Sequence, residues 1–304
     1  MDLILFLLLI VMTIIISYKL AYYIDTLNQI TNLGDMIIGS LLLASITSLP
    51  LFIVNLFNLT TNPCLVMENI LSNNIFNFAV IAIFDLLCVK YRFMDKISSN
   101  YLGPNLILIY IYVVIIAYFQ GNLLGNIANI GIPSIIIFII FLIYIMLIFK
   151  NEDDKPKINI KIVENYINFK LLISVILLTI SLILIYYINS KSLFFSNILI
   201  ISIIINLPKI ILFYYFININ NYNLAYANII GSNIFNFIFL VIIDLIFSNN
   251  IYDFYNQISL KLAYIGLWLT IILIYPIMRE KSLFKLTYLL PSICIIIAST
   301  IIFK

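Results

Sequence analysis

Apolar residues recur along the chain in runs of about 20, and short polar stretches separate the runs. A helix of this length, with a rise of about 1.5 Å per residue, crosses the roughly 30 Å hydrocarbon core of a bilayer. The pattern therefore predicts ten membrane-spanning helices and no soluble domain. The expected helices cover residues 3–24, 36–58, 65–89, 104–120, 131–149, 169–189, 194–217, 224–247, 256–278 and 283–302.

The longest polar stretch, residues 150–168, divides these helices into two groups of five. Because five is odd, the second group enters the membrane from the side opposite to the first. We therefore expect an all-α integral membrane protein with a first half (1–149), a cytoplasmic linker loop (150–168) and a second half (169–304).

The composition agrees with a membrane protein. Apolar residues make up 64% of the 304 positions and charged residues 10%, with a mean hydropathy of +1.17, which is far above the range of a soluble domain. We expect the lipid bilayer as the surroundings, and the net charge of +3 does not indicate a nucleic-acid partner. The three cysteines have no metal-ligand spacing, and nothing in the chain predicts a cofactor.

The distribution of lysine and arginine predicts the orientation, because short cytoplasmic loops carry an excess of both. One side of the expected bundle holds eleven such residues, and the other side holds three. The eleven are Lys90, Arg92, Lys96, Lys150, Lys155, Lys157, Lys161, Lys170, Arg279, Lys281 and Lys285, and the three are Lys191, Lys261 and Lys304. We therefore expect a multi-pass protein of the cell membrane with both termini outside and a first helix that is retained rather than cleaved.

Three features occur in the same order in each half. They are a Leu-Pro pair within an apolar span, an Asn-Ile-Phe-Asn motif in the next span, and an aspartate after that motif. The matching positions, 158, 159 and 159 residues apart, are Pro50 and Pro208, Asn77 and Asn236, and Asp85 and Asp244. Three features at nearly one offset predict an internal repeat, and five helices per half make it an inverted repeat.

The two prolines predict helix breaks, since proline removes one backbone hydrogen bond and clashes with the carbonyl four residues earlier. Irregular backbone is tolerated inside a membrane where it is buried in protein or lines a wet cavity, and inverted-repeat transporters bind their substrates at such breaks. Polar side chains on the next spans add to this pattern, namely Asn73, Asn74, Asn77, Ser232, Asn233 and Asn236. They favour an ion path, and the alternative is that they only join helices by hydrogen bonds.

At these motifs the chain resembles the cation/calcium exchanger superfamily, which contains the sodium/calcium exchangers and their prokaryotic relatives. The family pattern is close to GTSLPE followed by GNIIGSNIFN, present twice. Here the copies read ASITSLPL with ENILSNNIFN, and SIIINLPK with ANIIGSNIFN. The resemblance covers essentially the whole chain, with repeat motifs at 37–87 and 195–246, and implies cation antiport by alternating access.

The resemblance also implies a set of ion-binding and translocation positions. They are Ala44 and Ser202, through their carbonyl oxygens, and Thr47, Ser48, Leu51, Asn73, Asn77, Asn206, Lys209, Ser232 and Asn236. The side chains implied to hold a metal cation are Thr47, Ser48, Asn77, Ser232 and Asn236.

The chain departs from the family pattern at the charged positions. Leu51 and Lys209 stand where the family has glutamates, and Ile205 and Asn206 replace the second Thr-Ser. Calcium takes six to eight oxygens, and tight calcium sites almost always include carboxylates. The departures therefore predict altered ion selectivity or coupling.

Three acidic residues are candidates for a gate or a partner of Lys209. Glu68 lies nine positions before Asn77, toward the outer end of its helix, while Asp85 and Asp244 lie at matching positions of the two halves. The alternative is that all three are interfacial carboxylates in contact with headgroups and water.

Lys209 itself is expected deep in the membrane, where a lysine costs roughly 2.5 to 3.5 kcal/mol on insertion scales. One hypothesis makes it the titrating group of a proton-coupled cycle, because a buried amine can lose its proton. A second hypothesis makes its ammonium a tethered cation that permanently fills one ion site.

These observations predict a sodium/calcium exchanger-like cation antiporter with altered selectivity, whose partners are small cations such as sodium, calcium, potassium or protons. The alternative is a degenerate member of the same fold that no longer transports and acts as a structural or regulatory membrane protein. A weaker third possibility is an anion transporter that uses the charge of Lys209. An enzyme is not expected, since the chain has no histidine, no HExxH and no phosphate-binding loop, and hence no catalytic residue is assigned. The sequence leaves the oligomeric state open.

Overall fold

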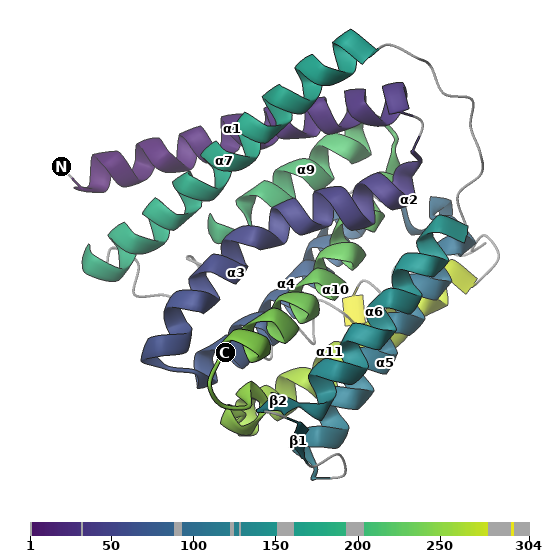
Figure 1. The fold of residues 1–304 in the computed structure, drawn as a ribbon. Coiled ribbons are helices and arrows are strands. Elements are labelled where there is room, and N and C mark those ends of the chain that lie inside the picture. The colour runs from purple at the N-terminus through teal and green to yellow at the C-terminus, as the bar shows by residue number, and fades with distance from the viewer. Residues whose placement is uncertain are drawn as a thin grey trace. The chain divides into compact units, whose positions relative to one another are not determined.

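The chain was analysed as a computed structural model that describes residues 2–31, 33–87, 93–121, 125–127, 129–150, 161–192, 204–278 and 293–294. These residues are almost entirely helical (Figure 1). They divide into two compact units: unit 1 is Met1–Val54 with Glu152–Asn228, and unit 2 is Asn55–Asn151 with Ile229–Lys304. Each unit therefore takes residues from both halves of the sequence.

Unit 1 is organised around two long helices, α1 (Asp2–Thr31) and α7 (Lys161–Ser192), which lie side by side (Figure 1). Thr13 on α1 donates a hydrogen bond to Ser181 on α7 over 3.2 Å, and α9 (Leu207–Asn218) also packs on α1. Since a bilayer offers no hydrogen-bond partners, uninterrupted helices are the structure that satisfies these long apolar segments.

The remainder of unit 1 is a helix of mixed type. A short turn, α2 (Asp35–Ile37), continues into the π-helix η1 (Ile38–Leu43) and then into α3 (Ala44–Thr61), whose last residues belong to unit 2. At Gly39 a side chain would not fit, because a Cβ atom there would lie 2.5 Å from that of Ala227, near the start of α10.

Unit 2 contains the rest of α3, then α4 (Cys64–Leu87), α5 (Leu102–Phe119), α6 (Ile132–Lys150), most of α10 (Tyr222–Ile246) and α11 (Gln257–Met278). Helix α11 packs on both α4 and α5, and α5 also packs on α6. Short elements connect these helices: the 3-10 helices η3 (Phe93–Lys96), η4 (Ser99–Tyr101) and η5 (Ile251–Phe254), and the antiparallel strands β1 (Asn126–Ile127) and β2 (Ile130–Gly131).

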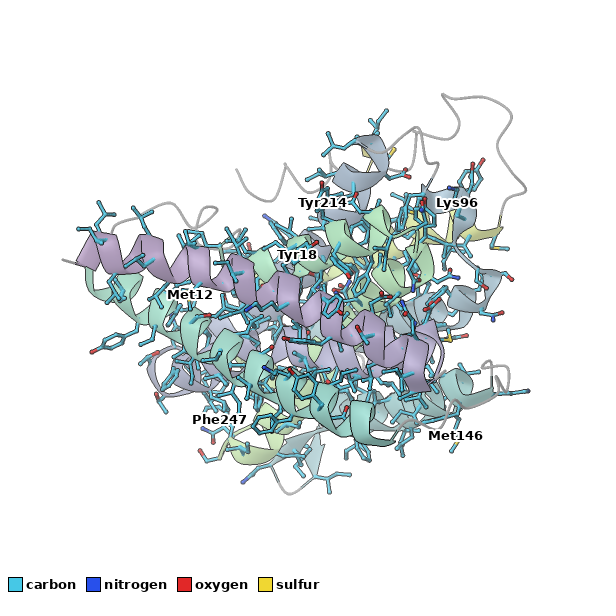
Figure 2. All side chains as sticks on the ribbon, turned by 90° about the horizontal axis from the view of Figure 1, so that it is seen from above. Met12, Tyr18, Lys96, Met146, Tyr214 and Phe247 are labelled. Carbon is cyan, nitrogen blue, oxygen red and sulfur yellow. The ribbon has the colours of Figure 1, made fainter. Side chains whose placement is uncertain are left out.

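The surfaces of both units carry many exposed apolar side chains. Met12 on α1 is 50% exposed and Met146 on α6 is 70% exposed (Figure 2). Such surfaces suit lipid rather than water. Among the described residues, eight helical segments are long and apolar enough to cross a membrane, and α9 is a shorter apolar helix. The prediction of an all-α multi-pass membrane protein is therefore confirmed.

Several sequence-based boundaries differ from the structure. The described residues contain eight spans of membrane length. The first ten residues of the expected helix 194–217 and almost all of the expected helix 283–302 lie outside the described residues. Helix α7 begins at Lys161, so the end of the expected linker loop 150–168 is helical. Helix α1 continues to Thr31 instead of residue 24, so the polar segment after Tyr23 is also helical. Polarity marks the membrane boundary, but a helix can extend beyond it.

Candidate functional site

Four asparagines of α4 and α10 form a hydrogen-bond network inside unit 2. Asn74 and Asn77 belong to α4, Asn233 and Asn236 belong to α10, and each is at most 1% exposed. Asn77 donates from Nδ2 to Oδ1 of Asn233 over 2.7 Å, and Asn236 donates from Nδ2 to Oδ1 of Asn74 over 2.6 Å. Asn74 and Asn233 each donate from Nδ2 to the main-chain oxygen of the other, over 3.3 and 3.4 Å. We call these four residues the asparagine network.

The hydrogen bonds of the asparagine network come in matching pairs. When Asn74 is exchanged with Asn233, and Asn77 with Asn236, every bond is converted into its counterpart. Both exchanges correspond to an offset of 159 residues. Each helix contributes side chains at positions i and i+3, which share a face. The two copies of the motif thus contact one another in the same way in both directions.

The asparagine network leaves two oxygens unpaired. Oδ1 of Asn77 and Oδ1 of Asn236 are buried and have no hydrogen-bond partner in the described part of the chain. Each belongs to an amide whose NH2 group is already bonded, so it is the oxygen face that remains free. A buried polar group without a partner costs about 1–3 kcal/mol. Carbonyl-type oxygens are also the ligands that hard cations use, so these two atoms are candidate cation ligands.

Two further polar residues flank the asparagine network at matching positions. Asn73 is 6% exposed and its Nδ2 has no acceptor among the described residues, while Ser232 is fully buried. The sequence prediction included both residues, together with Asn77 and Asn236. Asn74 and Asn233, which join the two helices, were among the polar residues predicted to favour an ion path, but the family resemblance did not imply them as ligands.

Tyr112 is a neighbour of the asparagine network that the sequence analysis missed. It lies fully buried on α5, its hydroxyl faces the amide of Asn74, and its ring meets that of Phe237 edge to face at 5.2 Å. This position requires Gly266 on α11, because a Cβ atom there would lie 2.4 Å from the tyrosine ring. Only the polarity of the hydroxyl within an apolar run could have drawn attention to Tyr112.

The two repeat-related aspartates of unit 2 bind backbone groups. Asp85 is buried and accepts from the N–H of Met94 over 3.4 Å, at the start of η3. Asp244 is 1% exposed and accepts from the N–H groups of Ile251, at the start of η5, and Gly131, over 2.9 and 2.8 Å. Both carboxylates thus hold the 3-10 helix that follows their own helix. Neither is exposed to headgroups and water.

Glu68 has a partner at the start of α11. Its carboxylate accepts a hydrogen bond from the side-chain amide of Asn256, and Asn256 also accepts from the backbone N–H of Ser259. This contact joins α4 to the first turn of α11 within unit 2.

The remaining predicted site residues belong to unit 1. Ala44, Thr47 and Ser48 are buried near the start of α3, where Thr47 donates to Oδ1 of Asn228 over 3.2 Å. Asn206, also buried, precedes the first residue of α9. Leu51 is half-buried. Ser202 lies outside the described residues.

The two prolines occupy different structural positions. Pro50 lies inside α3, which continues through it, so the predicted helix break is absent there, and the irregular segment is instead the π-helix η1. A membrane helix tolerates proline because one lost hydrogen bond can be replaced by its surroundings. Pro208 lies in the first turn of α9, which begins after a turn at Asn206. Helix α9 thus begins at the second Leu-Pro pair.

Lys209 follows Pro208 in the first turn of α9 and is 2% exposed. Among the described residues no carboxylate acts on its ammonium. The N-terminal turn of a helix is itself partly positive, so this is an unfavourable place for a cation. The part of the chain that the structure describes also contains no group of three or more His, Cys, Asp or Glu residues that could hold a metal ion.

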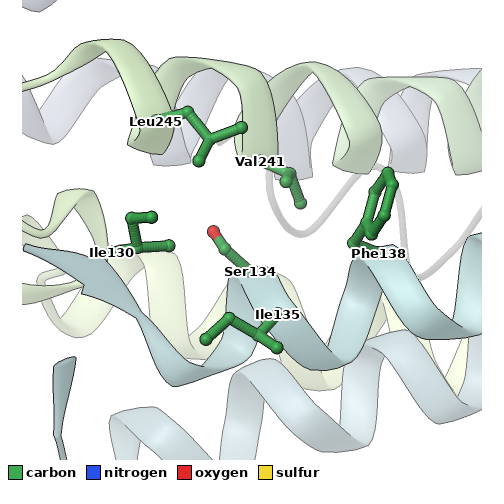
Figure 3. A pocket seen from close by; sticks show the side chains of 6 residues that line it. All are labelled: Ile130, Ser134, Ile135, Phe138, Val241 and Leu245. Carbon is green, nitrogen blue, oxygen red and sulfur yellow. The ribbon is translucent and has the colours of Figure 1, made fainter. Parts of the chain in front are cut away.

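An apolar pocket of about 250 Å³ lies between α6 and α10 in unit 2 (Figure 3). It is lined by Ile130, Ser134, Ile135, Phe138, Val241 and Leu245. The one hydroxyl in the lining, that of Ser134, donates to the hydroxyl of Tyr252 over 3.2 Å. The pocket therefore offers contacts for hydrocarbon and is not a candidate ion site.

The chain has the fold of solved membrane ion exchangers. Similar structures include several of the sodium-calcium exchanger NCX_Mj. One, soaked with 2.5 mM Na+ and 1 mM Sr2+, is 14% identical with a TM-score of 0.72, and the match covers 99% of this chain and 96% of that one. Another, soaked with 10 mM Na+ and zero Ca2+, is 17% identical with a TM-score of 0.71, and the match covers 99% and 98%.

No protein-family model and no curated protein matches the chain. The structural matches confirm the predicted resemblance at the level of the fold. Since identity is 14–17% in these two comparisons, the function has to be argued from the residues of this chain.

Proposed function

We propose that this protein is a secondary cation transporter of the sodium/calcium exchanger type that works by alternating access. The observation that carries the proposal is the pair of buried, unpartnered oxygens of Asn77 and Asn236. They sit at the positions where the family resemblance implies ion ligands, in a fold shared with an exchanger whose structures were obtained with Na+, Ca2+ or Sr2+. A cation bound to both oxygens would offset the cost of burying them unpaired.

We further propose that the selectivity differs from that of a calcium exchanger and favours small monovalent cations. Amide oxygens are neutral, and Leu51 and Lys209 supply no carboxylate at the two positions where the family has glutamates. Without carboxylates, little compensates for the loss of water around a divalent ion. A monovalent cation loses less hydration energy and fits a neutral set of ligands better.

We also infer that residues 1–149 and 169–304 are two inverted repeats. The matching bonds of the asparagine network support this, as do Asp85 and Asp244, each of which accepts from a backbone N–H within the first two residues of the 3-10 helix that follows its own helix. Transporters of this design bind their substrate where the repeats meet.

Lys209 accounts for altered coupling in this proposal in one of two ways. Either its amine exchanges a proton during the cycle, or its ammonium remains charged and replaces one transported cation. The first version requires proton-linked flux that disappears in Lys209→Ala, and pH-independent flux of the wild-type protein excludes it. The second version requires flux that does not depend on pH.

A second candidate function is a non-transporting structural or regulatory membrane protein. The observation that favours it is the loss of both glutamates, together with a buried lysine for which the described residues provide no counter-charge. Such a protein keeps the helix contacts of unit 2 without moving ions.

The decisive experiment is ion flux into proteoliposomes that contain the purified chain. Gradients of Na+, K+, Ca2+ and H+ are applied one at a time to the wild-type protein and to Asn77→Ala and Asn236→Ala. A matched control is Asn105→Ala, which also removes a buried asparagine of unit 2, but one whose amide bonds to Tyr101 of its own helical segment.

We expect flux driven by a monovalent cation in the wild type and in Asn105→Ala, and its loss in the two site variants. Flux that survives in both site variants rules out the proposed ligands. If the wild-type protein shows no flux with any of the four gradients, transport is ruled out and the second candidate function is favoured.

A further inference from the structure

The two asparagines that join α4 to α10, Asn74 and Asn233, use both the oxygen and the NH2 group of their side chains within the network. Asn233 accepts from Asn77 with Oδ1 and donates from Nδ2 to the main-chain oxygen of Asn74. Asn74 makes the equivalent pair of bonds, with Asn236 and with the main-chain oxygen of Asn233. The side-chain oxygens of Asn74 and Asn233 thus each accept a hydrogen bond, in contrast to those of Asn77 and Asn236, which have no partner among the described residues.

These bonds determine which way each amide points. A main-chain oxygen can only accept, so the NH2 group of Asn233 must face Asn74, and its Oδ1 must face the opposite way. That Oδ1 also can only accept, so Asn77 has to offer its NH2 group and keep its own oxygen free. The same argument applies to the other copy. The main-chain oxygen of Asn233 fixes the amide of Asn74, and Oδ1 of Asn74 then fixes the amide of Asn236. Each chain of bonds ends at an unpaired oxygen.

We propose that Asn74 and Asn233 are positioning residues that hold the ligand amides of Asn236 and Asn77 with the oxygen, and not the NH2 group, toward the transported cation. This inference rests on the proposed function. An amide free to rotate would present its donor part of the time, and a donor repels a cation. Outer-shell residues that orient metal ligands typically change metal affinity about 10- to 100-fold when they are mutated.

The arrangement also explains why position 77 holds an amide rather than a carboxylate. Aspartate has no donor, so its oxygens would face Oδ1 of Asn233 without a hydrogen bond. If Asn233 turned its amide to donate instead, its oxygen would face the main-chain oxygen of Asn74. The positioning residues therefore favour a neutral ligand, in agreement with selectivity for monovalent cations.

The test measures the KM for the cation that drives flux in proteoliposomes. In Asn233→Leu, which has similar bulk but no hydrogen bonds, we expect KM to rise about 10- to 100-fold with assembly retained. The control Asn105→Leu removes a buried asparagine outside the network and should leave KM unchanged. If Asn233→Leu does not reconstitute, its counterpart Asn74→Leu replaces it, with Asn236 as the affected ligand.

A double variant separates positioning from a structural role. A carboxylate presents oxygen in every rotation, so Asn77→Asp combined with Asn233→Leu should have a lower KM than Asn77→Asp alone, although both carry the same charge. If Asn233 only joined two helices, the double variant would be the weaker of the two. An unchanged KM in Asn233→Leu, or no gain in the double variant, overturns the positioning role while wild-type flux still supports the proposed function. Absence of any wild-type flux overturns both.

Discussion

The two halves of the chain are alike on α4 and α10 and differ on α3 and α9. On α4 and α10, the matching residues make matching bonds at the asparagine network and at Asp85 and Asp244. On α3 and α9, one helix runs through its proline and the other begins at it. The matching positions 51 and 209 hold a leucine and a lysine.

Under the proposed function, this difference separates the residues that hold helices together from the residues that set which ion is bound. The α4 and α10 residues bond to each other across the repeat, so a change in one copy leaves a buried group of the other copy unpaired. The residues that differ between α3 and α9 are the positions where the family resemblance implies charged ligands. Under the proposed function, divergence at these positions alters selectivity while the contacts between α4 and α10 are kept.

Among the variants that test this comparison, we expect the largest loss in the free energy of unfolding at the two aspartates, Asp244 and Asp85. Asp244→Leu leaves the N–H groups of Gly131 and Ile251 unpaired, at about 1–3 kcal/mol each, so we expect a loss of about 2–6 kcal/mol in the free energy of unfolding. Asp85→Leu frees the N–H of Met94 and should cost about 1–3 kcal/mol. Denaturant titration in mixed micelles, followed by circular dichroism, measures both.

The controls are Asp244→Asn and Asp85→Asn, which keep one accepting oxygen and should lose less. A loss in one aspartate variant without any loss in the other would show that the two copies are not equivalent here.

The next effect concerns the charge that distinguishes α9 from α3. Because a lysine deep in the membrane costs roughly 2.5–3.5 kcal/mol on insertion scales, Lys209→Leu should raise the free energy of unfolding by about 3 kcal/mol. The reverse change in the other copy, Leu51→Lys, should lower it by a similar amount. The same titration compares the two variants. Destabilisation in Lys209→Leu would contradict the prediction, since it would mean that the folded chain stabilises the ammonium.

Much of the fold could be predicted from the sequence, because apolar runs of membrane length leave few alternatives to helices. The composition of the units could not. The halves are divided by the polar stretch after Lys150, yet unit 1 pairs α1 with α7 from the other half. Hydropathy measures how each residue interacts with its surroundings, and it does not identify which helix packs on which.

The candidate site could be predicted only in part, because the sequence does not show which side chains face one another. The repeat pointed to Asn77 and Asn236, because their motif recurs at a constant offset. The roles of Asn74 and Asn233 depend on which amide faces which, and spacing along one chain does not contain this information. Tyr112 escaped attention because its position depends on the absence of a side chain at Gly266 on another helix.

The prolines provide a smaller test of the asymmetry. Proline inside a helix costs about 3 kcal/mol relative to alanine, whereas proline in the first turn is well tolerated. We therefore expect Pro50→Ala to raise the free energy of unfolding by up to about 3 kcal/mol, and Pro208→Ala to change it by less than about 0.5 kcal/mol. Hydrogen exchange of the backbone amides near each proline locates the change. An equal change in the free energy of unfolding for Pro50→Ala and Pro208→Ala would contradict the predicted difference between a proline inside a helix and a proline in its first turn.

The smallest expected effect is at Thr47, which bonds to Asn228, while the matching position on the other copy is Ile205 and cannot form such a bond. Hydrogen bonds between membrane helices contribute about 0.6 kcal/mol on average, so Thr47→Val should lower the free energy of unfolding by about that amount. A double-mutant cycle of Thr47→Val with Asn228→Ala isolates the bond, and Ile205→Val serves as the matched control without a hydroxyl. A coupling energy near zero would show that Thr47 does not stabilise unit 1 through Asn228.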